Sequence, residues 1–203
     1  MVETRMRRVN FVLLGLIILV NLYTIALPFL PNIGYWWHNR GGDKPVSVAA
    51  YIKKTTNSSN PNEDTSGNRI IIPRMSLNTP LLEGPKSDSF NLLKAGAWHL
   101  PFSTDPTQGG NMVVAAHRFS YTGPRGLFYF LDKLQVGDEI GVQWGGKLYH
   151  YQVASTRVVS PTEISVQGPT DDTRLTLYTC TPLFNPVNRL VVVAKPVDEG
   201  ATP

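Results

Sequence analysis

The chain has a single cysteine, Cys180, which stands at the end of a strand-like run. In that run, residues 175–179, β-forming residues alternate with threonine as in a half-buried strand, and Pro182 ends it because proline cannot donate to a central ladder. A second strand-like run, residues 189–194, follows a connection rich in proline and asparagine. If the two runs pair as an antiparallel hairpin, the end of the first lies beside the start of the second. We therefore expect Cys180 to meet Arg189.

A third candidate residue is His117, in the run 109–118, where two glycines give way to a buried apolar segment that ends in this histidine. A thiol is mostly protonated at neutral pH, so a nucleophilic cysteine needs a nearby base or a positive field. His117 is the candidate for that base. Arg189 stays charged and cannot act as a base, but its fork of donors suits the oxyanion of a tetrahedral acyl-transfer intermediate. The three residue types together indicate acyl transfer through a thiolate.

These motifs, in this order, resemble the sortase family, the membrane-anchored cysteine transpeptidases of bacterial cell surfaces. Residues 176–180 are similar to the family's TLxTC strand, Arg189 follows nine positions later, and a Gly-Asn-x-Val-x-Ala-x-His run ends at His117. The resemblance extends over residues 68–197. One departure is Ala116, because glycine often precedes the family histidine. Besides these motifs, the segments that match the family are 69–73, 81–84, 96–110 and 149–159.

The resemblance implies a role for each of the three residues. Cys180 would be the nucleophile, His117 the general acid or base, and Arg189 the contact to the oxyanion or the substrate. It also implies a groove for a sorting peptide of the LPxTG type. The candidate substrate-binding residues are Thr179, Ala116, Ile164 and Val166, the last two within the connection 158–173.

The implied reaction begins when Cys180 attacks the threonine carbonyl of a sorting signal on a secreted protein. His117 protonates the departing amine, and an amine of a peptidoglycan precursor or a pilin lysine resolves the thioacyl-enzyme. No cofactor is implied. No Asp-Pro-aromatic lid precedes the domain in the sequence, so the resemblance is nearer to the housekeeping-like or class D/E sortases than to the lidded pilin class C.

Two functions from other classes remain open. An L,D-transpeptidase-like peptidoglycan enzyme also uses cysteine and histidine, but such enzymes hold both in one short motif, whereas 63 positions separate His117 from Cys180 here. A non-catalytic surface β-domain would need none of these residue types at strand ends. His99 could be a second catalytic histidine in a segment that borders the family's cleft, or a satisfied histidine with a structural role only.

Charge and composition exclude several partners. The net charge of the 203 residues is +4, but residues 69–203 carry twelve Lys/Arg against eleven Asp/Glu. A domain so close to neutrality gives no electrostatic footprint for nucleic acid. One cysteine cannot form an intrachain disulfide or a zinc cluster, and no acidic residues stand at metal-ligand spacing. We expect no metal.

The N-terminal part predicts a membrane anchor. Residues 11–30 contain no charge and follow Arg5, Arg7 and Arg8, and twenty residues suffice for a helix to cross a hydrocarbon core of about 30 Å. The positive flank places residues 1–10 in the cytoplasm and the C-terminal part outside. We therefore expect a single-pass plasma-membrane protein, in contact with lipid through residues 11–30. A cleaved signal peptide is the alternative.

The rest of the chain predicts a spacer, an all-β domain and a tail, over residues 31–68, 69–197 and 198–203. Short strand candidates separated by turn-forming residues indicate a closed barrel. The resemblance implies a sortase-like barrel of about eight strands with one or two short helices. A helix is expected over residues 126–134, where apolar residues have helical spacing, and residues 46–52 could form another. The strand candidates are 69–72, 78–82, 112–116, 139–144, 147–156, 174–179 and 189–194.

Overall fold

The computed structural model describes residues 2–26, 30–38, 45–56, 67–119, 126–183 and 185–197. The expected tail, 198–203, lies outside the described residues, as do residues 39–44 and 57–66 of the expected spacer. The chain divides into two units, Met1–Lys44 and Pro45–Pro203, which are described separately.

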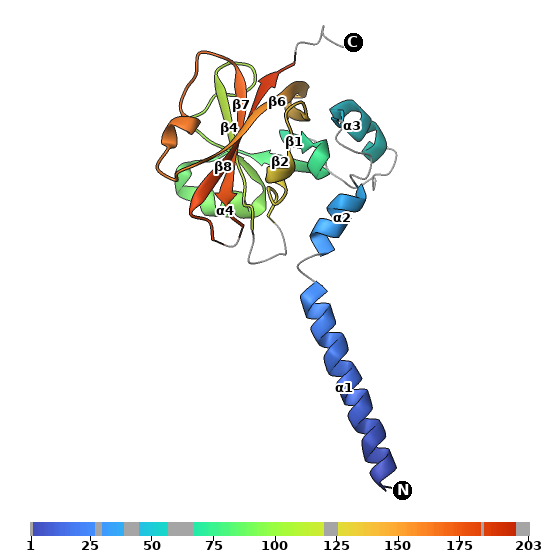
Figure 1. The fold of residues 1–203 in the computed structure, drawn as a ribbon. Coiled ribbons are helices and arrows are strands. Elements are labelled where there is room, and N and C mark those ends of the chain that lie inside the picture. The colour runs from blue at the N-terminus through green and yellow to red at the C-terminus, as the bar shows by residue number, and fades with distance from the viewer. Residues whose placement is uncertain are drawn as a thin grey trace. The chain divides into compact units, whose positions relative to one another are not determined.

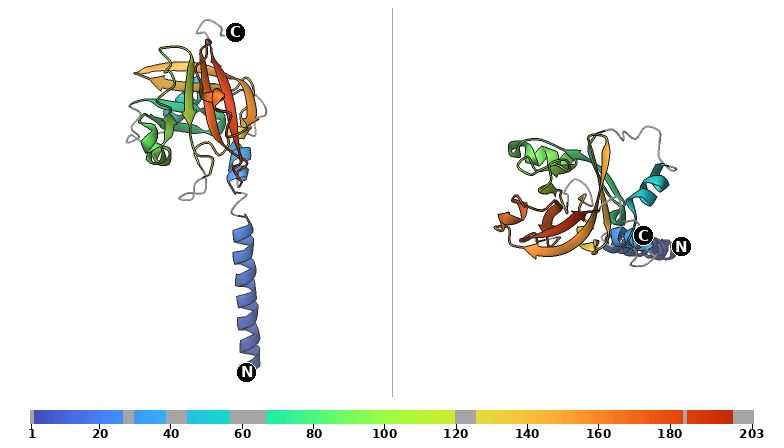
Figure 2. Two further views of the ribbon diagram at one scale, coloured as in Figure 1. Left: turned by 90° about the vertical axis from the view of Figure 1, so that its left-hand side faces the viewer. Right: turned by 90° about the horizontal axis from the view of Figure 1, so that it is seen from above.

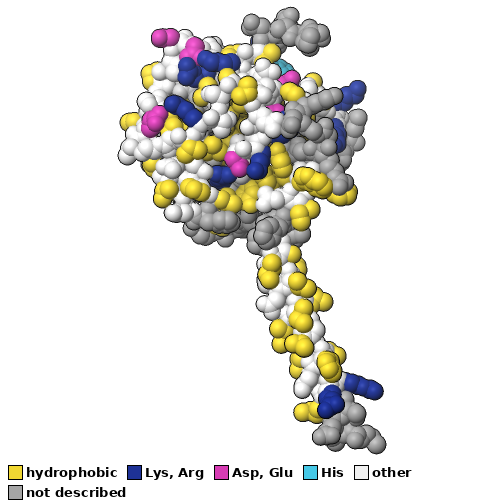
Figure 3. Space-filling view, in the orientation of Figure 1, with side chains coloured by type: hydrophobic (Ala, Val, Ile, Leu, Met, Phe, Trp, Pro, Cys, Tyr) yellow, Lys and Arg dark blue, Asp and Glu magenta, His cyan; other side chains and the backbone are white. Residues whose placement is uncertain are grey.

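The first unit holds the helices α1 (Val2–Ala26) and α2 (Leu30–His38). Apolar side chains cover α1, and arginines gather near its N-terminal end (Figure 3). The segment Arg5–Ala26 is long and apolar enough to cross a membrane, with a mean hydropathy of 2.2. Asn21 satisfies its amide inside the helix by donating to the Ile17 carbonyl at 2.8 Å. This helix fits a membrane anchor.

Within the described residues, the second unit contains eight strands that close into a barrel (Figures 1 and 2). The expected all-β barrel is confirmed. The order around it is β1-β2-β3-β4-β7-β8-β6-β5, and only the β2–β3 and β4–β7 pairs are parallel. The three-residue β3 was missed in the sequence because it is too short for a periodic pattern. The strands are β1 (Arg69–Ile72), β2 (Leu77–Leu82), β3 (Ala97–His99), β4 (Asn111–Ala115), β5 (Glu139–Trp144), β6 (Lys147–Val159), β7 (Arg174–Thr181) and β8 (Asn188–Pro196).

The second unit also contains short helices. The helix α3 (Val48–Thr56) lies within the expected spacer, yet it packs on β5: the amide of Val48 donates to Glu139 Oε2 at 2.9 Å and the Val48 side chain is fully buried. A second helix, α4 (Ser89–Ala95), follows β2. The single-turn helices are η1 (Pro73–Met75), η2 (Lys86–Asp88), η3 (Leu131–Lys133) and η4 (Ile164–Gln167).

The prediction of a helix over residues 126–134 is wrong. The segment forms turns and the short η3. Its core residues Phe128, Leu131 and Leu134 stand three apart, and the amides of Leu131 and Leu134 bond the carbonyls three residues earlier, at 3.2 and 3.3 Å. That period belongs to a 3₁₀ turn rather than to an α-helix.

The strand β4 is buried on both faces, which explains its uninterrupted apolar sequence. Met112 and Val114 lie in the barrel core. Val113 and Ala115 pack on the outside with Trp98 and two leucines of α4. The two faces alternate along the strand, so the residue two places beyond Ala115 continues the outer face.

Candidate active site

Three neighbouring strands bring the candidate residues to one edge of the barrel. β7 lies between β4, which is parallel to it, and β8, which is antiparallel. The C-terminal ends of β4 and β7 and the start of β8 therefore meet at the same edge (Figures 1 and 2). His117, Cys180 and Arg189 stand at these three strand ends.

Cys180 and Arg189 are direct partners in the β7–β8 register. Residues opposite each other in an antiparallel pair project to the same face, with Cβ atoms about 4.5–5.5 Å apart. The meeting expected from the sequence is therefore confirmed. Cys180 is a free, half-buried cysteine between the buried Thr179 and Thr181. Its thiol lies on the outer face of the barrel, not in the core.

The guanidinium of Arg189 is held beside the thiol by its neighbours. Nε donates to the hydroxyl of Tyr178 at 3.2 Å, and Nη1 donates to the carbonyl oxygens of Asn188, at 3.0 Å, and Pro186, at 3.4 Å. Within the described residues Nη2 has no such partner. The donors of Nη2 remain available to an oxyanion or a substrate carbonyl.

His117 is fixed through its backbone. Before it, the amide of Ala116 donates to the Tyr178 carbonyl at 3.4 Å, and the hydroxyl of Thr179 donates to the Ala116 carbonyl at 2.7 Å. These bonds carry the β4–β7 register past the end of β4 and place His117 level with Cys180. The carbonyl of His117 accepts from the amide of Phe128 at 3.0 Å.

His117 is an exposed residue and Cys180 is half-buried. In the part of the chain that the structure describes, neither the imidazole of His117 nor the thiol of Cys180 forms a hydrogen bond. Catalytic hydrogen bonds are commonly long in the absence of substrate and shorten in the reacting complex. A candidate nucleophile, a candidate base and a guanidinium whose Nη2 has no partner among the described residues thus share one face of the barrel.

Comparison with known proteins places the chain in a family. Residues 70–197 match the family model described as a Sortase domain. The chain belongs to the sortase family. It is 31% identical over 144 residues to Sortase SrtE1 of Streptomyces coelicolor and 31% identical over 150 residues to Sortase A of Listeria monocytogenes. These matches cover 64% and 73% of this chain, but only 40% and 63% of the two relatives.

Solved structures of sortases share the fold. Sortase C1 of GBS Pilus Island 1 has a TM-score of 0.59 at 31% identity, and the match covers 67% of this chain and 66% of that one. A Clostridium perfringens Sortase D5 transpeptidase has a TM-score of 0.57 at 27% identity, over 75% and 90% of the two chains. The similar proteins carry A, C, D and E designations, and the class of this sortase stays a prediction.

The four predicted substrate-binding residues are placed very differently in this sortase. Only Ile164 exposes its side chain, at 73%. Val166 is buried against Val159 and Val191, and Ala116 lies in the barrel core. Thr179 is 2% exposed and its hydroxyl is used by the Ala116 carbonyl. Contact between substrate and Thr179, Ala116 or Val166 would therefore go through the backbone, and the Thr179 hydroxyl instead joins β7 to the segment after β4.

Asn111, the asparagine of the Gly-Asn-x-Val motif, has a structural role that the sequence analysis missed. Its side-chain amide donates to the carbonyls of Val166, at 3.2 Å, and Gly168, at 2.9 Å, and its oxygen accepts from the Thr176 hydroxyl at 2.7 Å. It is 2% exposed. Asn111 thereby fixes the connection between β6 and β7 onto the barrel. The signal was a polar residue at the head of an otherwise apolar strand.

His99 has the structural role that was one of its two interpretations. It is buried, its Nε2 lies 3.0 Å from the Thr104 carbonyl oxygen, and its Nδ1 lies 3.5 Å from Glu83 Oε1. The ring packs edge-on against Trp144 with 5.1 Å between ring centres. A side chain so enclosed has little freedom to act in catalysis. Among the described residues, no three His, Cys, Asp or Glu side chains form a group that could hold a metal.

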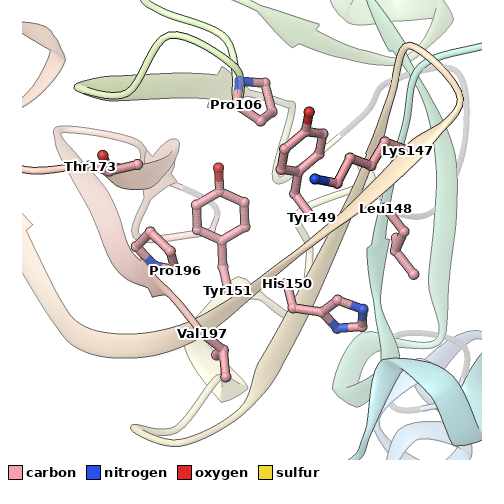
Figure 4. Close-up of a pocket in the computed structure, with 9 residues that line it drawn as sticks. All are labelled: Pro106, Lys147, Leu148, Tyr149, His150, Tyr151, Thr173, Pro196 and Val197. Atoms are coloured by element: carbon pink, nitrogen blue, oxygen red, sulfur yellow. The ribbon is translucent and has the colours of Figure 1, made fainter. Parts of the chain in front are cut away.

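A cavity of about 160 Å³ opens at the other end of β7, where that strand begins and β8 ends. Tyr149 and Tyr151 project into it from β6, whereas His150 points away (Figure 4). Burial, with a smaller contribution from Tyr149, raises the pKa of Tyr151 to about 12. This cavity is separate from the three candidate catalytic residues.

Proposed function

We propose that this sortase is a cysteine transpeptidase that cleaves an LPxTG-like sorting signal and joins the released acyl group to an amine. The observation that carries the proposal is the direct pairing of Cys180 with Arg189 on the outer face, level with His117. The Clostridium perfringens relative, which is covered to 90% of its length, is itself described as a transpeptidase.

The first half of the reaction acylates Cys180. Its proton passes to His117, and the thiolate attacks the carbonyl carbon of the threonine in the sorting signal. The negative oxygen of the tetrahedral intermediate accepts hydrogen bonds from Arg189. The bond from that carbon to the glycine nitrogen then breaks, His117 gives its proton to the departing amine, and a thioester remains.

The second half releases the product. A primary amine attacks the thioester carbonyl, loses a proton to His117, and forms a new amide while the carbon–sulfur bond breaks. Cys180 leaves as a thiolate and the cycle closes. Transfer instead of hydrolysis requires that the amine be positioned ahead of water. The acceptor amine belongs, on this proposal, to a peptidoglycan precursor or a pilin lysine.

The chain's layout supports a surface location for this reaction. We assign α1 as an uncleaved single-pass anchor, with residues 1–10 in the cytoplasm and the catalytic domain, residues 69–197, outside the cell. The arginines at the start of α1 favour the cytoplasmic side. Residues 31–68 would link anchor and enzyme, with α3 packed on the barrel at the end of that link.

The test is product analysis. The full chain in detergent micelles is incubated with a library of peptides around Leu-Pro-x-Thr-Gly, with peptidoglycan stem peptides and with candidate amines, and products are identified by mass spectrometry. A peptide joined through its threonine to an amine supports transpeptidation and names both partners. Cleavage of peptidoglycan stem peptides alone would favour the L,D-transpeptidase-like function. Absence of any turnover or thiol-dependent labelling would favour a non-catalytic domain.

A further inference from the structure

Arg118, the residue after the candidate base, is almost buried and bonded on every side. Nη1 donates to the hydroxyl of Thr181 at 2.7 Å, Nη2 lies 3.0 Å from Asp132 Oδ1, and Nε donates to the Tyr129 carbonyl at 3.5 Å. Its side chain is 10% exposed. Asp132 balances its charge, and Lys133 lies 3.5 Å from the other oxygen of that carboxylate. The guanidinium of Arg118 is therefore already bonded and is not available as a free cation to bind substrate.

The contacts of Arg118 complete a symmetrical arrangement around the two candidate catalytic residues. Ala116 and Arg118 flank His117, and Thr179 and Thr181 flank Cys180. Thr179 bonds the Ala116 carbonyl at 2.7 Å, and Thr181 accepts from Arg118, also at 2.7 Å. The segments 116–118 and 179–181 are thus joined at both outer positions. The middle residues are the base and the nucleophile.

We call the joined segments 116–118 and 179–181 the clamp. The segment after Arg118 adds further contacts to the clamp. The amide of Gly126 donates to the Arg118 carbonyl at 3.1 Å, and Asp132 stands in η3, whose Leu131 is fully buried in the core. The guanidinium is therefore held at one side by Asp132, which belongs to a helix anchored in the core. At its other side it donates to Thr181 at the end of β7. Because an arginine fork bonds several partners in one plane, a lysine could not keep all of these contacts.

We propose that Arg118 is a positioning residue, which holds the His117 segment against the end of β7 through Thr181 and so sets the separation of imidazole and thiol. This inference rests on the proposed function and deepens it. Arg118 acts through its neighbours and does not touch the substrate. Its effect should therefore be felt in the chemical step and in the titration of Cys180, with little change in substrate affinity.

The decisive variant is Thr181→Val. It keeps the β-branched shape and leaves the charges of Arg118 and Asp132 in place, so any change reports position rather than electrostatics. Thr181→Ser restores the hydroxyl and is the matched control. Arg118→Lys keeps the charge and loses the fork. The double variant with Arg118→Lys and Thr181→Val completes a double-mutant cycle. His117→Ala gives the reference for a thiol without its base.

Two readouts are measured on the full chain in micelles: kcat and KM with a sorting peptide, and the pH dependence of Cys180 alkylation by iodoacetamide. We expect Thr181→Val to lower kcat by about 10- to 100-fold with KM within a factor of about three, and to move the alkylation midpoint towards that of His117→Ala. Thr181→Ser should retain wild-type values. The double variant should be no worse than Arg118→Lys alone, because the bond to Thr181 is already lost in Arg118→Lys.

Alkylation separates this inference from the proposed function. A chain that turns over no peptide, yet whose alkylation profile shifts in Thr181→Val as in His117→Ala, would support the clamp while rejecting transpeptidation. Unchanged kcat and alkylation in a folded Thr181→Val chain would overturn the inference, as would strictly additive effects of the two changes. If Thr181→Val does not fold, Asp132→Asn, at a side chain 35% exposed, loosens the same guanidinium and is judged by the same criteria.

Discussion

Gly126 passes so close to His117 that a Cβ atom built on it would lie 2.1 Å from the His117 carbonyl oxygen and 2.5 Å from its carbonyl carbon. Both atoms are backbone, so neither can rotate away. The close approach allows the amides of Gly126 and Phe128 to bond the carbonyls of Arg118 and His117, at 3.1 and 3.0 Å. Glycine is required here by lack of space.

The first prediction concerns Gly126→Ala. The added methyl group must push the His117 backbone by about an ångström, and a displacement of that size lowers a catalytic rate by about 100-fold. Steady-state kinetics with a sorting peptide measure the effect. Gly145→Asn is the control, since its Cβ meets nothing within 4 Å and asparagine tolerates its positive φ of 56°. Equal activity of the two variants would contradict the placement of His117.

Arg189→Lys tests the guanidinium. Lysine keeps the positive charge but lacks the planar fork that bonds Tyr178 and two carbonyls while presenting Nη2. We predict a fall in kcat of about 100-fold or more with an unchanged melting temperature. Tyr178→Phe, which removes only one support of the fork, should lower kcat less. Wild-type turnover by Arg189→Lys would reject its proposed role.

Asn111→Asp tests the connection between β6 and β7 as a wall of the peptide groove. An ionised aspartate can accept from Thr176 but cannot donate to the carbonyls of Val166 and Gly168. We predict a higher KM with a smaller change in kcat, and a loss of about 1–3 kcal/mol in the free energy of unfolding. Thr176→Val, which leaves both donated bonds intact, is the control. A KM unchanged in Asn111→Asp would remove this connection from substrate binding.

Much of the site was accessible from the sequence because it depends on strand register. Alternation in residues 175–179 and 189–194, together with the turn between them, was enough to predict that Cys180 meets Arg189. His117 was found from the apolar run that leads to it and from the need of a thiol for a base, and the family resemblance then gave each of the three residues its role. These predictions work because side chains alternate strictly along a strand, so facing residues follow from pairing alone.

Contacts between distant residues were not accessible in the same way. Arg74 and Asp138 form a buried ion pair at 2.7 Å, and Arg118 reaches Thr181, although 63 or more positions separate the partners in each case. No local pattern encodes such pairs. The expected helix over 126–134 failed for a related reason: the packing of Phe128 and Leu131 in the core decides between an α-helix and a 3₁₀ turn.

Tyr151 gives a pH-dependent prediction. Its pKa is raised from 10.0 to about 12 by burial. Between these values the unfolded chain loses the tyrosine proton while the folded chain keeps it, so this contribution to stability is complete below pH 10 and is lost as the pH rises towards 12. Tyr151→Phe should weaken the alkaline fall in the free energy of unfolding.

Ultraviolet absorbance of the phenolate checks this assignment. The difference between the titration curves of the wild type and Tyr151→Phe should have its midpoint near pH 12. Tyr149→Phe, at the neighbouring position in the same cavity, is the comparison. A difference curve for Tyr151 centred near the ordinary value of 10.0 would show that the side chain is not shielded from water.

The central claim is that the Cys180 thiol forms a thioester with a sorting peptide. Intact-mass spectrometry of the full chain, quenched shortly after mixing with an LPxTG-type peptide and no amine, tests it most directly. We predict a mass increase equal to that of the peptide up to and including its threonine less one water, located on Cys180 by fragmentation and absent from Cys180→Ala. Hydroxylamine should remove it as the threonine hydroxamate. A chain that cleaves the peptide without this adduct, or that keeps the adduct in Cys180→Ala, would contradict the account.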